Sequence, residues 1–191
     1  LNGMDQRVAG LADVHYAAGN GTQRIRSATP ATLTVSNNAA RTFGAAGSAI
    51  EGAVSLKKLG PATLTLTGTN SYSGATVVSN GTLAVSATGT LGTNSLAVAV
   101  GGSGTLLLSN AVAIADAAVV RMPESGVATA KIQLDAGEET VGWLLYGEAF
   151  KSVGTYGATG SGANHIDDTH FSGSGRLRVL HSKSGTLLKV L

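Results

Sequence analysis

The sequence contains no cysteine among its 191 residues, so disulfide bonds and thiolate metal sites are excluded. Charged residues make up only 13% of the chain, whereas about a quarter of an ordinary globular domain is charged. The 13 basic and 11 acidic side chains form no block, so no nucleic-acid partner is expected. No run approaches the roughly 20 apolar residues of a membrane-spanning helix, and we expect no membrane span.

What the chain does contain is apolar residues of small and medium size together with 27 glycines. Hydrophobic residues make up 43% of the chain, although aromatic residues contribute only 4%. A disordered chain has too few apolar residues to build a core, so this composition favours a folded protein. The length suits one domain, which we place at residues 1–180, followed by a separate tail strand at 181–191.

Short segments with alternating apolar and polar residues recur along the chain and predict strands with one buried face. The clearest are 31–36, 62–67, 81–86 and 104–109, and looser ones follow at 96–100, 131–134 and 176–180. Gly and Asn-Gly pairs between them allow tight corners. The Ala-rich run 111–120 lacks the polar face of a helix, and we interpret it as another part of the same coil.

Evenly spaced short strands suit either an antiparallel sandwich or a β-solenoid, and self-similarity separates the two. The Thr-Leu-x-Leu/Val unit returns after 31, 19 and 23 positions, from Leu33 to Leu64, Leu83 and Leu106. Spacings of this size are typical of solenoid repeats. The sequence therefore predicts an all-β protein, a right-handed parallel β-helix with Gly and Asn corners.

Residues 56–86 carry a family resemblance. The order is a lysine pair at 57–58, a leucine strand at 64–66, the Asn-x-Tyr-x-Gly corner at 70–74 and an Asn-Gly-Thr-Leu strand at 80–83. This order resembles the autotransporter-associated β-strand repeat of exported bacterial proteins. The resemblance implies a β-helical passenger that is secreted or displayed at the cell surface.

Two further segments are similar to parts of such arrays, and two depart from them. Residues 153–175 resemble a closing segment, and residues 1–11 resemble the rung that often precedes the repeat. The pair Pro61-Ala62 stands where a Gly-containing pair is more usual, and the tail 181–191 has no counterpart in the family. The tail is therefore a feature of this chain in particular.

Few side chains point to chemistry. His165, Asp167, Asp168 and His170 could ligate a metal or act as acids and bases, but a turn rich in Asp explains the same residues. The neighbours Glu138 and Glu139 should point to opposite faces of a strand, unlike the paired carboxylates of a glycosidase. We expect no catalytic residue, no cofactor and no metal.

The two ends of the predicted coil show no cap, so they should expose unpaired strand edges. Residues 185–191 read as a strand that is apolar on both faces, which needs cover on both sides. The sequence therefore predicts head-to-tail self-association with other copies of the chain, and the residues assigned to it are Leu1, Leu187, Leu188, Val190 and Leu191. The alternatives are that the tail returns to its own helix or marks where a longer passenger was cut.

Three functions fit these features: a structural scaffold that assembles into filaments, an adhesin that binds a surface glycan, and a carbohydrate-active enzyme. The aromatic residues of the C-terminal third either pack a cap or form a sugar-binding or partner surface; they are Trp143, Tyr146, Phe150, Tyr156 and Phe171. Repetition and the lack of clustered carboxylates favour the scaffold.

Overall fold

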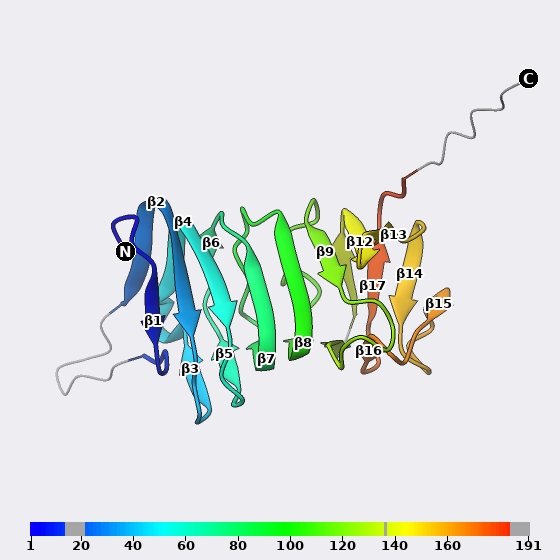
Figure 1. Ribbon diagram of the computed structural model, residues 1–191, viewed down its shortest axis with the longest axis horizontal. Coiled ribbons are helices and arrows are strands. Elements are labelled where there is room, and N and C mark those ends of the chain that lie inside the picture. Colours follow the sequence, from blue (N-terminus) through cyan, green and yellow to red (C-terminus); the bar gives the residue numbers. More distant parts are fainter. Residues whose placement is uncertain (14–21, 136, 184–191) are drawn as a thin grey trace, which may run out of the picture.

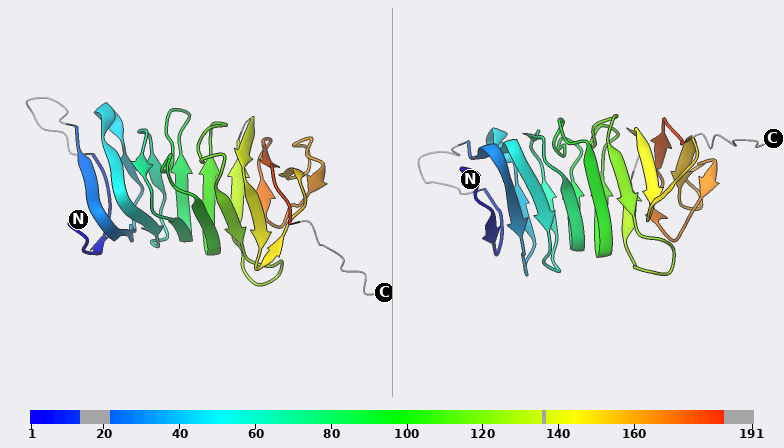
Figure 2. Two further views of the ribbon diagram at one scale, coloured as in Figure 1. Left: turned by 90° about the horizontal axis from the view of Figure 1, so that it is seen from above. Right: turned by 45° about the horizontal axis from the view of Figure 1, so that its top comes forward.

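The computed structural model describes residues 1–13, 22–135 and 137–183. Within these ranges the chain forms β-strands and one short 3-10 turn, η1 (Ala45–Gly47). The strands stack as parallel coils into a β-solenoid of about six turns, which follow one another along the long axis (Figures 1 and 2). The predicted fold class is confirmed, and no α-helix forms in the described part of the run 111–120.

Two columns of strands run along the solenoid. The first column contains β1 (Gln6–Val8), β2 (Arg24–Val35), β4 (Ala49–Lys58), β7 (Thr76–Val85), β8 (Ala97–Leu108), β9 (Val119–Met122) and β12 (Trp143–Tyr146). The second contains β3 (Arg41–Phe43), β5 (Leu64–Leu66), the later parts of β7 and β8, β10 (Lys131–Leu134) and β16 (Phe171–Ser172). Because β7 and β8 bend through both columns, each holds two sides of its coil together.

The remaining strands complete the third side and the C-terminal end. β6 (Ser71–Tyr72) pairs with β4, and β11 (Glu138–Val141) pairs with β17 (Arg176–Val179). Beyond them lie β13 (Ala149–Phe150), β14 (Gly154–Gly157) and β15 (His165–Ile166).

The core follows from the alternation in the sequence. Leu64, Leu83 and Leu106 are register partners in successive coils, and all three are fully buried. Their threonine neighbours point outward, because successive side chains of a strand alternate between its faces. Burying one such leucine contributes roughly 2 kcal/mol, so repeated columns of this kind account for the stability of a narrow core with few aromatic residues.

The structure corrects the predicted repeat lengths. The spacings of 19 and 23 residues are true coil lengths, since Leu64 pairs with Leu83 and Leu83 with Leu106. The spacing of 31 residues is not the length of one coil, because Leu33 pairs with Leu56 in the first column, whereas Leu64 lies in the second. The same Thr-Leu pattern occurs on two sides of one coil, so similarity alone does not identify the register.

The C-terminal end is built differently from the parallel coils, which the sequence did not predict. β13 pairs antiparallel with β12, and β14 pairs antiparallel with β17, so the direction of the chain reverses beyond the last parallel coil. These short strands lie over that end in Figure 1. At the N-terminal end, β1 pairs with β2 alone among the described strands, and at the C-terminal end β13 and β15 also have one partner each. The two ends differ in that the C-terminal end contains antiparallel pairs, whereas β1 and β2 are parallel.

Candidate functional surfaces

The residues that distinguish the repeat lie inside the coil. Asn70 is buried, and its Oδ1 accepts a hydrogen bond from the backbone N–H of Ile50 at 2.8 Å. Its Nδ2 donates to the carbonyls of Gly68 at 3.1 Å and of Thr90 at 2.6 Å. One amide thus joins three consecutive coils at a corner where the strand ladder is interrupted.

Tyr72 and Gly74 complete this corner. The buried Tyr72 hydroxyl lies 2.6 Å from Thr76 Oγ1, and burial raises the pKa of Tyr72 to about 12. A side chain at Gly74 would place its Cβ 2.5 Å from the carbonyl oxygen of Val54, so only glycine fits there. The Asn-x-Tyr-x-Gly motif is therefore a device for packing one coil against the previous one.

Lys58 is the buried lysine of the motif. Its Nζ donates to the carbonyls of Gly60 and Asn80, the latter at 3.2 Å, and burial lowers the pKa of Lys58. Val35 and Val78 are its register partners in the adjacent coils, so the lysine occupies an otherwise apolar position. In the described structure, Lys58 therefore supplies hydrogen-bond donors to backbone carbonyls at the corners of the coil.

The four candidate metal ligands make different contacts. His165 stacks on Tyr156 with ring centroids 4.5 Å apart, and Asp168 accepts hydrogen bonds from the backbone and hydroxyl of Thr159, both at 2.7 Å. Asp167 instead contacts His170, whose Nδ1 lies 2.8 Å from Asp167 Oδ2. No group of three His, Asp or Glu side chains with metal-ligand geometry occurs in the described ranges.

Asp167 is the centre of a polar cluster under the C-terminal strands. It accepts hydrogen bonds from the Tyr146 hydroxyl at 2.5 Å and from the backbone of Thr169 and His170 at 3.1 Å each. Burial opposes ionisation of Asp167, but the bonds from Tyr146 and His170 outweigh it and hold the pKa of Asp167 below its ordinary value. His170 Nε2 lies 3.0 Å from the carbonyl of Pro123. The cluster therefore connects β12, through Tyr146, and the loop after β9, through Pro123, to the C-terminal end of the solenoid.

Glu138 and Glu139 point to opposite faces of β11, as predicted. Glu138 lies outside and contacts Arg176 at 2.6 Å. Glu139 is 1% exposed and accepts hydrogen bonds from the backbone N–H groups of Ala113 and Ile114, both at 2.9 Å. Burial raises the pKa of Glu139 to about 7, and the negative charge of Asp116 adds to the rise. The two carboxylates do not form a glycosidase pair.

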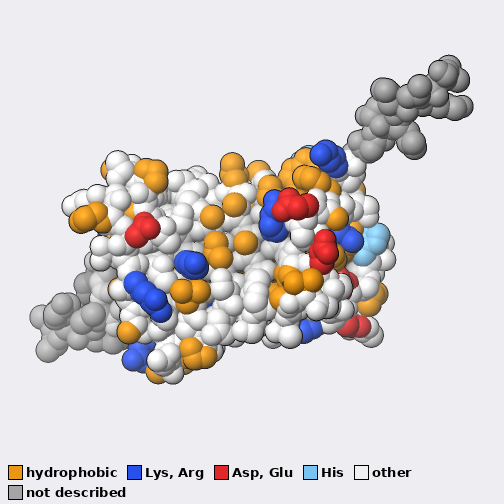
Figure 3. Space-filling model, viewed as in Figure 1, with side chains coloured by type: hydrophobic (Ala, Val, Ile, Leu, Met, Phe, Trp, Pro, Cys, Tyr) orange, Lys and Arg blue, Asp and Glu red, His pale blue; other side chains and the backbone are white. Residues whose placement is uncertain are grey.

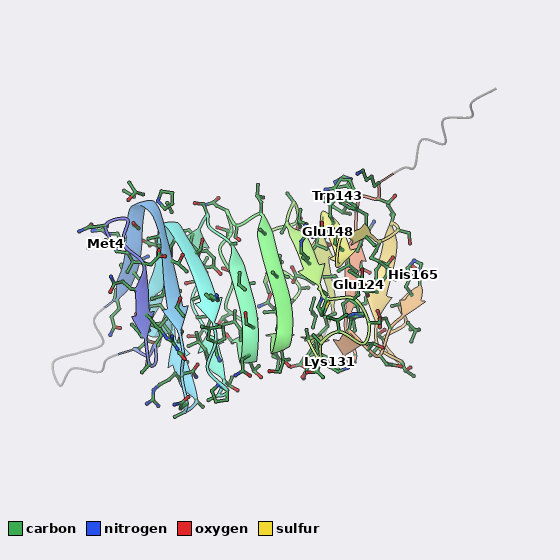
Figure 4. All side chains as sticks on the ribbon, viewed as in Figure 1. Met4, Glu124, Lys131, Trp143, Glu148 and His165 are labelled. Atoms are coloured by element: carbon green, nitrogen blue, oxygen red, sulfur yellow. The ribbon has the colours of Figure 1, made fainter. Side chains whose placement is uncertain are left out.

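The aromatic residues divide into a buried group and a group at the surface. Tyr146, Tyr156 and Phe171 are buried and pack the C-terminal end. Trp143 and Phe150 instead lie at the surface in edge-to-face contact, with ring centroids 5.3 Å apart. Figure 4 shows Trp143 well apart from His165.

The surface around Trp143 is a groove of about 390 Å³ over β9, β12 and β13, which we call the Trp143 groove. Its lining residues are Val119, Arg121, Trp143, Leu145, Phe150 and Lys183. Apolar side chains are grouped on this face in Figure 3, with charged side chains beside them. One signal for this groove is present in the sequence, because the outward positions Ala97, Val119 and Trp143 are all apolar. Their alignment, however, depends on a register that only the fold reveals.

The residues predicted for self-association are only partly described. Leu1 is partly buried and packs against the core. Leu187, Leu188, Val190 and Leu191 lie outside the described residues. Among the described residues, no helical segment has the length and hydropathy of a membrane span.

Comparison with protein families supports the repeat. Residues 56–85 match the family described as passenger-associated-transport-repeat, so the predicted autotransporter-associated repeat is confirmed. The repeat and the β-solenoid together fit a passenger-type β-helical protein, and the repeat indicates an exported or surface protein. The curated proteins and the solved structures gave no match.

Proposed function

We propose that the chain is a non-enzymatic structural part of an extracellular passenger protein and that copies of it associate head to tail. The observation that carries the proposal is the edge of β1, a parallel strand that has β2 as its one partner among the described strands. At the other end, the edge strands β13 and β15 are only two residues long, and β13 is antiparallel to its partner. An exposed strand edge accepts an added strand from another chain.

The geometry of β1 identifies the groups on this edge. The carbonyl of Val8 accepts a hydrogen bond from the backbone of Ser36 at 2.9 Å, so the polar backbone groups of Val8 face β2. The backbone groups of neighbouring residues in a strand point to opposite sides. The N–H and C=O of Arg7 therefore point away from β2, toward the edge.

The proposed donor is the tail strand, residues 185–191. Its sequence Gly-Thr-Leu-Leu-Lys-Val-Leu has apolar residues on both faces, which suits a strand placed between two layers. Strand addition to β1 would use backbone hydrogen bonds for affinity and the leucines for burial. Repetition of one heterologous contact of this kind produces a filament.

Light scattering of the purified chain tests the proposal. The full chain should grow in mass with concentration, and a chain that ends at residue 183 should remain a monomer. Arg7→Pro should also abolish growth because it removes the edge N–H, whereas the matched control Arg7→Ala keeps that N–H and should associate normally. Equal masses for the full and the shortened chain, or equal effects of the two Arg7 variants, would contradict head-to-tail association through β1.

A further inference from the structure

The Trp143 groove is an apolar surface that lacks a partner in the described structure. Leu145 forms its buried floor, while Phe150 on its rim is 41% exposed. Leu96, which is 58% exposed, precedes Ala97, the register partner of the lining residue Val119. Large exposed apolar side chains that lie together indicate a surface covered by something else.

The chain itself leads from the last strand to this groove. After β17, the backbone N–H of Leu180 donates to Val141 at 3.0 Å, and that of His181 donates to Gly142 at 2.9 Å. These two bonds hold the chain beside the start of β12. The His181 ring then lies 5.2 Å from the Trp143 ring, and Lys183 Nζ lies 5.5 Å from the centre of the Phe150 ring. Lys183, the last described residue, is therefore already part of the groove.

The segment that follows has the composition and length to fill the groove. Residues 184–191 contain three leucines and a valine. Eight extended residues reach roughly 26 Å. The outward side chains of Trp143, Val119 and Ala97 lie on adjacent strands, which are about 4.8 Å apart, so crossing them needs about 10 Å. The tail is long enough to cover the groove of its own chain.

Covalent attachment favours the chain's own tail over other occupants. A segment tethered at Lys183 is present at an effective concentration of the order of millimolar, far above that of a second copy in dilute solution. The groove is lined mainly by carbon atoms of Val119, Trp143, Leu145 and Phe150, which suits leucine and valine better than a hydroxyl-rich sugar.

We propose that residues 184–191 dock in the Trp143 groove of the same chain when no neighbouring copy holds them. The docking site is supported by the groove and by the path of the chain up to Lys183. The consequence of docking for assembly rests on the function proposed above. Docking on the groove and addition to β1 of another copy use the same leucines, so they exclude each other. The groove thus stores the tail and raises the concentration at which copies associate.

Trp143 is the only tryptophan of the chain, so its fluorescence reports on the groove alone. Acrylamide quenching is compared between the full chain and a chain that ends at residue 183, at a concentration where light scattering finds monomers of both. Removal of the tail should increase quenching and shift the emission to longer wavelength, since the indole ring gains contact with water. The paired substitution Leu188→Ser with Val190→Ser should do the same, and the matched control Ser184→Ala should not.

The outcomes separate this proposal from head-to-tail association. Equal quenching of the full and shortened chains overturns docking on the groove, even if the shortened chain no longer associates. Protection of Trp143 that appears only as the concentration rises also overturns it, because the tail would then come from another copy. Phe150→Ala weakens the groove and leaves β1 intact, so this variant should associate at a lower concentration than the parent protein. If the variant needs a higher concentration to associate, the groove does not store the tail.

Discussion

The middle of the solenoid and its C-terminal end are built by different means. Residues 61–115 contain no Asp, Glu, Lys, Arg or His, whereas residues 138–183 contain five acidic residues, four basic residues and three histidines. In the middle, each coil is covered by a similar coil on either side. At the end, the stack stops, and antiparallel strands with a polar cluster around Asp167 take the place of the next coil.

This difference shows which physical effect dominates in each region. A column of leucines in register buries apolar surface without needing one particular partner, so the middle tolerates a plain repeat. An end must satisfy the backbone groups that a further coil would have paired, which takes specific hydrogen bonds. Substitutions in the two regions should therefore have effects of different kinds.

The largest effect is expected in a leucine column of the middle. Leu83→Ala removes a fully buried side chain that stacks between Leu64 and Leu106, and it should lower the free energy of unfolding by about 2–5 kcal/mol. Leu96→Ala is the control, since that side chain is 58% exposed, and it should change stability by less than about 0.5 kcal/mol. Urea unfolding followed by circular dichroism measures both, and similar losses would contradict the assigned core.

The next effect depends on pH and belongs to the C-terminal end. The pKa of Glu139 is about 7 in the folded protein, above its ordinary value of 4.5. The folded state therefore binds a proton that the unfolded state releases between these values, so stability increases as the pH falls from about 7 to 4.5. The full shift corresponds to a gain of about 3 kcal/mol.

Unfolding in urea at pH 5 and pH 8 tests this linkage. The parent protein should be more stable at pH 5, and Glu139→Gln, which cannot ionise, should lose that difference. The window avoids Asp167, whose pKa lies below its ordinary value of 3.8. A variant that keeps the full pH dependence would show that Glu139 is not its source.

Two tyrosines allow a matched comparison with smaller effects. Tyr146→Phe removes a hydrogen bond to the Asp167 carboxylate and should cost about 2 kcal/mol, whereas Tyr72→Phe removes a bond to the neutral Thr76 hydroxyl and should cost about 1 kcal/mol. Thermal unfolding of both variants gives the ranking. The reverse order would mean that the Tyr146–Asp167 hydrogen bond contributes less to stability than the Tyr72–Thr76 hydrogen bond.

The sequence predicted the middle well and the end poorly. Alternation located the strands around Leu64, Leu83 and Leu106, because one buried face leaves a period of two. It misplaced Leu33, since two sides of each coil carry the same pattern and only pairing distinguishes them. The pairing of Tyr146 with Asp167, and of Trp143 with Phe150, depends on reversals of the chain that leave no periodic signal.

The central claim is that copies join head to tail through β1 and the tail, and cross-linking tests it most directly. Because the chain has no cysteine, Gln6→Cys and Leu187→Cys each introduce a single thiol. When equal amounts of the two proteins are mixed and oxidised, disulfide-linked dimers that contain one copy of each should form well in excess of the twofold ratio over either homodimer that random pairing gives. A mixed dimer at or below that statistical ratio would contradict head-to-tail association.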